Sequence, residues 1–275
     1  MGLFNPNYDK PGKGVSKNEP DKKGAALYWD LFSRKWRSYI VLNLLYAVTC
    51  IPAFIFYFLF VVGLMPATST AESTAISGMV AAFMIVFFAG SPFKSGFIYV
   101  LRNYVRQQHA WTTSDFFGKT KENLGQSVAA FIIDLVASCC FLVAIKFYFT
   151  VSETTLWVSI VLGAVIIAMV LFAIMQSFTW CMMVTFELKL SAIYKNAFLL
   201  SMATIPVNLL SLIIRAVATL AIFASSYLSY LIILVVFLAA AGLLEQMIAY
   251  PAIKKFLMPK EEEPEVIENM EEEND

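Results

Sequence analysis

The chain has 275 residues, of which 59% are hydrophobic and 15% are charged, and its mean hydropathy is +0.71. Soluble domains contain roughly 45–50% apolar and about 25% charged residues, so this composition excludes an ordinary water-soluble domain and indicates an integral membrane protein. The 20 basic and 20 acidic residues cancel, but many of the acidic residues lie near the C-terminus, so the rest of the chain carries a net positive charge. A basic body with an acidic tail argues against nucleic acid as a partner and favours contact with an anionic membrane surface.

Residues 1–26 form a polar, basic segment with five lysines among its first 25 residues. The segment has no apolar core of the kind found in a cleaved signal peptide, so the first membrane helix is expected to direct insertion. We predict a cytoplasmic N-terminal segment at 1–26, a transmembrane domain at 27–258 and a disordered acidic tail at 259–275.

Six segments are long and apolar enough to cross a bilayer, which takes about 20 residues. They lie at 39–62, 76–95, 127–147, 157–176, 196–215 and 227–245. The second, fourth and sixth continue as amphipathic stretches at 97–105, 178–186 and 247–258, and short amphipathic stretches at 30–35, 115–121 and 190–196 precede the odd-numbered spans. The predicted fold is an all-α, six-span transmembrane helical bundle with short amphipathic cytoplasmic helices.

This order of elements also fits a threefold helical-hairpin repeat. Each unit would contain a lead-in helix, two antiparallel spans and a cytoplasmic extension. Apolar segments resemble one another by composition alone, so the repeat and a coincidence of composition both stay open.

The basic residues indicate the orientation of the spans, because short basic loops are retained in the cytoplasm. Eighteen of the 20 lysines and arginines lie before the first span, in the even-numbered connections or after the last span. The three opposite loops, at 63–75, 148–156 and around 225–226, contain none. Both termini are therefore predicted to be cytoplasmic.

Counting residues from the cytoplasmic ends places the charged side chains at different depths. Lys146 and Arg215 fall at the outer interface, where they can snorkel to headgroups, and Lys94 and Glu245 fall at the inner interface. Asp134 alone lies deep, about 10 Å into the third span at 1.5 Å per residue.

Asp134 has two interpretations. It could bind a cation or a proton, or pair with a basic residue of a partner protein, since ionisable groups inside membranes are usually functional. Alternatively, it could join helices by hydrogen bonds to Asn43, Tyr46 or Asn208, which lie at comparable depth. Pro52, Pro92 and Pro206 interrupt three spans, and bent spans either line a solute path or are ordinary kinks.

Catalytic and metal-binding motifs are missing. The four cysteines lie in apolar runs, and the single histidine, His109, lies in a polar cytoplasmic turn. The chain has no phosphate-binding Gly-rich loop and no nucleophile or zinc motif. We assign no catalytic residue, no metal and no cofactor, and expect a protein that is not an enzyme.

The cytoplasmic loops carry candidate partner-docking residues that combine aromatic side chains with positive charge. They are Phe116, Phe117, Lys119 and Lys121 in the first internal loop, and Tyr194 and Lys195 in the second. The same residues would suit an interfacial helix lying on anionic headgroups, and both interpretations stay open.

Several stretches together resemble the YesL-like family of bacterial membrane proteins, whose genes usually lie beside carbohydrate ABC transporter genes. They are YDKPGKGV at 8–15, NLLY at 43–46, LRNYVR at 101–106, SDFF at 114–117, VTFEL at 184–188 and IYKNA at 193–197. Where the family typically has a Gly-Pro pair, this chain reads Gly90-Ser91-Pro92.

The resemblance implies a bacterial plasma membrane protein linked to sugar uptake, with the permease and ATPase subunits of a carbohydrate ABC transporter as partners beside the lipid bilayer. Such permeases dock their ATPase through a Glu-Ala-Ala-like loop that ends in glycine. The internal loops lack that motif, and residues 184–197 contain no glycine. We therefore expect an accessory subunit that assembles, stabilises or regulates the transporter; the alternative is a solute pathway formed by this chain itself.

Overall fold

The computed structural model describes residues 22–64, 80, 91–151, 156–225 and 233–258, and every regular element in these ranges is helical. The helices are α1 (Gly24–Arg34), α2 (Trp36–Gly63), α4 (Lys94–Val105), α5 (Thr112–Glu122), α6 (Leu124–Val151), α7 (Leu156–Met183), α8 (Leu190–Ala203), α9 (Ile205–Ser225), the π-helix η1 (Ile233–Phe237) and α11 (Leu238–Leu257). The predicted all-α class is confirmed.

Four helices of the described chain are long and apolar enough to cross a membrane, and a bent pair of helices could make a fifth. The predicted spans 39–62, 127–147 and 157–176 fall in α2, α6 and α7, which confirms them as long apolar helices. Most of the predicted span 76–95 and the start of 227–245 lie outside the described residues, as do residues 1–21 of the predicted segment 1–26 and the whole of the predicted tail 259–275. The structure therefore confirms a multi-pass helical membrane protein, whereas the count of six spans is not confirmed.

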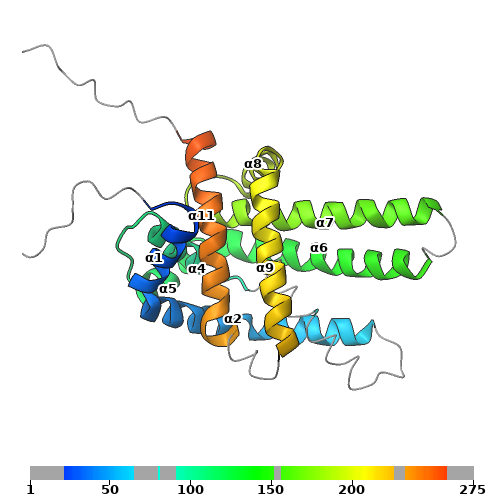
Figure 1. Cartoon of the computed structure of the whole chain (residues 1–275), viewed down its shortest axis with the longest axis horizontal. Coiled ribbons are helices and arrows are strands. Elements are labelled where there is room, and N and C mark those ends of the chain that lie inside the picture. The colour runs from blue at the N-terminus through cyan, green and yellow to red at the C-terminus, as the bar shows by residue number, and fades with distance from the viewer. Residues whose placement is uncertain (1–21, 65–79, 81–90, 152–155, 226–232, 259–275) are drawn as a thin grey trace, which may run out of the picture.

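Figure 1 shows how the helices are arranged. Helices α2, α6 and α7 run along the long axis of the molecule, and α6 packs beside α7. Helices α1, α4 and α5 gather at one end of these three, while α9 and α11 run across them. The amphipathic lead-ins at 30–35, 115–121 and 190–196 are helical, because they fall largely within α1, α5 and α8.

The predicted fifth span is broken. Helix α8 ends at Ala203, α9 begins at Ile205, and the two are bent by 93°. Pro206 lacks a backbone N–H and disfavours a helical conformation at the residue before it. The sequence predicted a kinked but continuous helix at 196–215, and the structure corrects this to two helices of different direction.

Helix α9 is apolar on its exposed side and polar on its buried side, the reverse of a helix in a soluble protein. Its exposed residues include Val207, Leu210, Ile214 and Val217, and its buried residues include Asn208, Ser211, Arg215 and Thr219. Helices α2, α6 and α7 also expose many large apolar side chains. An apolar exterior around a polar interior is the pattern expected when lipid rather than water surrounds the protein.

Aromatic contacts attach α1 to the rest of the molecule. Phe32 of α1 stacks on Tyr39 of α2 at 5.2 Å between ring centroids, and Tyr39 meets Tyr104 of α4 edge to face at 5.1 Å. The hydroxyl of Tyr28 donates to the carbonyl oxygen of Ala240 in α11 at 3.1 Å. These contacts fix α1 between α2, α4 and α11.

Helices α4 and α5 approach closely at Gly96. A Cβ atom at position 96 would collide with the backbone carbonyl oxygen of Phe116 and with the hydroxyl of Thr120. Glycine at this position therefore lets the backbone of α5 lie directly against α4, and the contact buries Phe116 completely.

We expect Gly96→Ala to destabilise the protein by about 1–3 kcal/mol, the usual cost of overpacking, because the backbone atom of Phe116 cannot move aside without displacing α5. Thermal unfolding in detergent measures the loss. Gly118→Ala is the matched control, since a Cβ there meets nothing within 4 Å. An unchanged midpoint for Gly96→Ala would contradict the described packing of α4 on α5.

Candidate functional site

Polar side chains are buried in the interior on six helices, α2, α4, α6, α7, α9 and α11. They are less than 9% exposed: Asn43, Lys94, Asp134, Gln176, Asn208, Arg215, Glu245 and Gln246. Burying so many polar groups away from water is costly unless they are paired or bind something. We therefore treat this polar interior as a candidate functional site.

Asp134 of α6 holds three helices together. Its Oδ2 accepts a hydrogen bond from Trp180 Nε1 of α7 at 3.2 Å, and its Oδ1 accepts one from the Tyr194 hydroxyl of α8 at 3.3 Å. Both carboxylate oxygens thus have a donor. This geometry supports the interpretation of Asp134 as a residue that joins helices, although its described donors are not the side chains that the depth count suggested.

Lys94 of α4 lies close to this carboxylate. Its ammonium nitrogen is 5.4 Å from the centroid of the Trp180 ring, and its charge acts on Asp134. Depth counting placed Lys94 at the inner interface, whereas in the structure it is buried beside the deep aspartate. Gln176 of α7 also lies beside Asp134 and Tyr194, but neither of its side-chain polar atoms makes a well-formed hydrogen bond.

A second buried pair joins α9 to α11. Arg215 Nη1 donates to Glu245 Oε2 at 2.7 Å, and both side chains are less than 10% exposed. The depth count placed Arg215 at the outer interface and Glu245 at the inner one, which is wrong. The count assumed a straight fifth span, and the 93° bend before α9 carries Arg215 to Glu245 instead.

Asn43 and Asn208 satisfy backbone groups where helices begin. Asn43 Oδ1 accepts from the backbone N–H of Ala239 at 2.7 Å, next to the change from η1 to α11. Asn208 Nδ2 donates to the carbonyl oxygen and to the hydroxyl of Thr204, at the bend between α8 and α9. Both asparagines lie in the interior as predicted, and these contacts are with helix ends rather than with Asp134.

The predicted docking residues separate into buried and accessible ones. Phe116 is fully buried against Phe93 and Gly96, and the Tyr194 hydroxyl is directed toward Asp134. The accessible side chains are those of Phe117, Lys121 and Lys195. The alternation of Phe116 and Phe117 follows from α5 being helical, because adjacent residues point in different directions around a helix.

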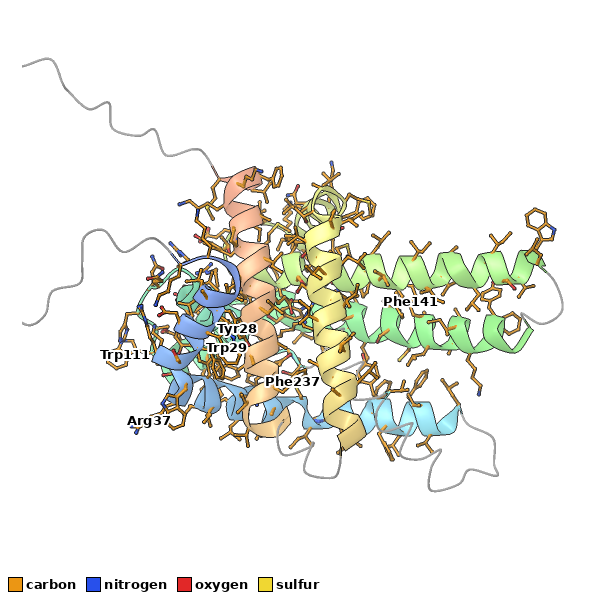
Figure 2. All side chains as sticks on the ribbon, viewed as in Figure 1. Tyr28, Trp29, Arg37, Trp111, Phe141 and Phe237 are labelled. Carbon is orange, nitrogen blue, oxygen red and sulfur yellow. The ribbon has the colours of Figure 1, made fainter. Side chains whose placement is uncertain are left out.

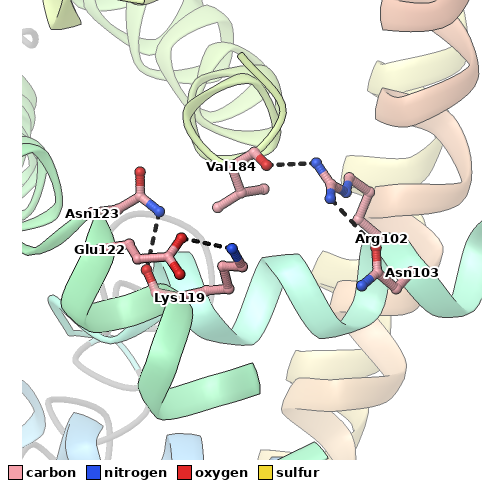
Figure 3. Close-up of polar contacts among 6 residues, drawn as sticks. All are labelled: Arg102, Asn103, Lys119, Glu122, Asn123 and Val184. Atoms are coloured by element: carbon pink, nitrogen blue, oxygen red, sulfur yellow. Dashed lines mark hydrogen bonds and ion pairs between the residues drawn. The ribbon is translucent and has the colours of Figure 1, made fainter. Parts of the chain in front are cut away.

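Lys119 is partly buried and already has partners. It donates to Glu122 at 2.6 Å and lies 5.2 Å from the centroid of the Tyr99 ring. The hydrogen bond to Glu122 raises the pKa of Lys119 above its usual value. Figure 3 shows this pair beside Asn123, whose side chain donates to the Lys119 carbonyl oxygen.

Two cavities lie beside these residues. One, of about 590 Å³, is lined by Lys119, Glu122, Gln126 and the segment after α7. The other, of about 500 Å³, is lined by Arg102, Arg106 and Lys254. Both share Val184 and Thr185 as lining residues, and Arg102 contacts these two residues, as Figure 3 shows for Val184.

Sequence reasoning missed several of these residues. Trp180 and Gln176 lie in an apolar stretch of the sequence. The indole N–H of Trp180 and the amide of Gln176 were the only signs in the sequence that these two residues could be partners of Asp134. Arg102 was counted only as part of the basic asymmetry, and its burial could not be seen without the packing of α4. Within the described residues, no group of three or more His, Cys, Asp or Glu side chains could hold a metal ion.

Comparisons of the chain with protein-family models, with curated proteins and with solved structures find no match. The class that the fold and the site define is an all-helical, multi-pass membrane protein with a polar interior. Its exposed helical surfaces are apolar, and one buried ion pair, Arg215 with Glu245, joins two of the described helices.

We expect Arg215→Met and Glu245→Leu each to destabilise the protein by about 3–5 kcal/mol, because each leaves one buried charge without its partner. The double variant should recover most of this loss, since an apolar pair replaces a buried ion pair at little cost. Thermal unfolding in detergent measures all three, and Lys195→Met is the exposed control. Additive losses in the double variant would contradict the contact between α9 and α11.

Proposed function

We propose that this chain belongs to the YesL-like family and acts as a non-enzymatic accessory subunit of a carbohydrate ABC transporter. The sequence resemblance supports the family and the partners, which are permease and ATPase subunits. The observation that carries the proposal is an exposed aromatic and basic surface on α5, the helix that packs on α4 at one end of α2, α6 and α7 (Figure 1).

This surface, which we call the α5 face, consists of Phe117 and Lys121, which lie four residues apart on one side of α5, with the exposed Trp111 directly before the helix. Trp111 is 71% exposed and Phe117 is 48% exposed. Figure 2 shows Trp111 at the outer edge of this end, in the same part of the molecule as Arg37. Aromatic residues in an exposed, rigid position are the usual anchors of protein interfaces, and Phe117 is held against Phe93 and Phe116.

We also propose that the α5 face lies in the cytoplasm of a bacterial cell, where an ATPase or a regulator could reach it. The charge asymmetry of the loops supports six spans with both termini cytoplasmic in the plasma membrane. The exposed tryptophans agree with two membrane interfaces. Trp29, Trp36 and Trp111 belong to one end of the molecule, and Trp157 begins α7 at the other.

A reporter fused to the C-terminus should give a cytoplasmic signal, and a reporter inserted into 63–75 should give an extracytoplasmic one. The reason is that basic residues, which are retained in the cytoplasm, occur near the C-terminus and are absent from 63–75. Paired fluorescent-protein and alkaline-phosphatase fusions measure both. Equal expression of the fusions is the control. A phosphatase-active C-terminal fusion would rule out the proposed orientation.

Phe117→Ser should reduce co-purification of the permease and ATPase subunits about tenfold, the effect of losing about 1.4 kcal/mol of binding. Quantitative pull-down in mild detergent measures it. Trp157→Ser is the matched control, since it removes a 77% exposed aromatic side chain at the opposite end of the bundle. Phe116 is left unchanged because its substitution would damage the core.

Undiminished co-purification of Phe117→Ser at equal expression would exclude the α5 face from docking. An equal loss with Trp157→Ser would show that the effect is not local to that face.

A solute pathway formed by this chain is the second candidate function. The amide group of Gln246 favours it, because it is buried and has no hydrogen-bond partner in the described part of the chain. Buried polar groups of this kind inside a membrane protein commonly line a hydrated path. Sugar uptake by vesicles that contain only this protein would favour the pathway over the accessory role.

A further inference from the structure

The second cavity lies between the C-terminal part of α4, the residues after α7 and the last turns of α11. Its volume is about 500 Å³. Three cationic side chains line it, from Arg102, Arg106 and Lys254, together with Tyr250. Among the described residues that line it there is no carboxylate. This concentration of one charge does not depend on the proposed accessory role.

Arg102 is the fixed part of this cavity. It is 6% exposed, and its Nη1 donates to the Val184 carbonyl oxygen and to Thr185 Oγ1 (Figure 3). Its guanidinium carbon lies 4.8 Å from the centroid of the Tyr99 ring. These contacts hold the guanidinium in one orientation against the wall of the cavity.

The positive charge of Arg102 has no anionic partner in the described part of the chain. Its acceptors are a carbonyl, a hydroxyl and the amide oxygen of Asn103, all of which are neutral, and its buried Nε has no hydrogen-bond partner. Burying a cation without a counter-charge is costly. A site built in this way is completed when an anion binds.

Two further cations increase the need for an anion. Arg106 lies over the Tyr250 ring at 5.6 Å from its centroid, and Lys254 is one helical turn beyond Tyr250 on α11. Burial is the main cause that lowers the pKa of Arg102, and the positive charge of Arg106 lowers it further. Bringing these like charges around one cavity is unfavourable in the absence of an anion.

We propose that this cavity binds the phosphate group of an anionic ligand, held by Arg102, Arg106 and Lys254. Phosphate suits the site because it can accept several charge-assisted hydrogen bonds at once, and arginine presents a planar fork of donors to it. The cavity volume falls within the range of roughly 300–1,000 Å³ that is typical of ligand sites. It therefore leaves room for the organic part of a lipid headgroup or of a soluble phosphate ester.

Inorganic phosphate is the first probe. Thermal unfolding and calorimetry of the full-length protein in a non-ionic detergent should show stabilisation by sodium phosphate beyond that by sodium chloride at equal ionic strength. Arg106→Gln and Lys254→Gln should each weaken phosphate binding about tenfold, because each removes one charge-assisted contact. Both side chains are exposed, so both variants should fold.

Lys255→Gln is the matched control, because Lys255 is also exposed and neighbours Lys254 but does not line the cavity. Its phosphate affinity should equal that of the unmodified protein. Arg102→Lys retains the charge but not the fork, and it should also bind phosphate more weakly. Unchanged affinity in the Arg106→Gln/Lys254→Gln double variant would overturn the proposal.

Lipid nanodiscs distinguish the two sources of the phosphate group. If the ligand is a lipid, phosphatidylglycerol in phosphatidylcholine nanodiscs should stabilise the protein more than the same charge supplied as oleate, and the double variant should lose the difference. If the ligand is soluble, inorganic phosphate should stabilise the protein equally in pure phosphatidylcholine nanodiscs. Failure of both phosphate and phosphatidylglycerol to exceed chloride and oleate would overturn the proposal.

Discussion

Inside a bilayer, every backbone N–H and C=O group must find its partner within the protein, and the described structure depends on how it meets this requirement where helices break. Asn43 reaches from α2 to the N–H of Ala239 at the start of α11. The side chain of Asn208 in α9 donates hydrogen bonds to the carbonyl oxygen and to the hydroxyl of Thr204 at the bend. Thr204 itself donates from its backbone N–H and from its hydroxyl to the Leu200 carbonyl oxygen, so this carbonyl in the last turn of α8 is paired where α9 leaves the direction of α8.

The change of direction at Thr204 determines which charges meet. It turns the polar side of α9 toward α11, so that Arg215 finds Glu245 at 2.7 Å. Asp134 is held separately, by donors from α7 and α8, with Lys94 of α4 nearby. These four buried charges thus form two groups, one that joins α9 to α11 and one that joins α6, α7 and α8 beside α4.

The long apolar helices and the amphipathic lead-ins could be predicted because hydropathy and period are local properties of the sequence. The depth of Arg215 could not, because depth counting treats a span as straight, and Pro206 was interpreted as a kink rather than as a break. Which of Phe116 and Phe117 is buried could not be predicted either, because it depends on the close contact of α5 with Gly96 of α4. The partners of Asp134 come from helices far apart in the sequence, which no local pattern specifies.

The two cavities share one structural element, the short segment that follows α7. Its Val184 and Thr185 line both cavities and accept hydrogen bonds from Arg102. Tyr99 lies between Arg102 and Lys119, within 4.8 Å and 5.2 Å of them. The fixed arginine of the phosphate cavity and the lysine that lines the neighbouring cavity therefore contact the same tyrosine ring of α4, which makes the two cavities adjoining parts of one surface.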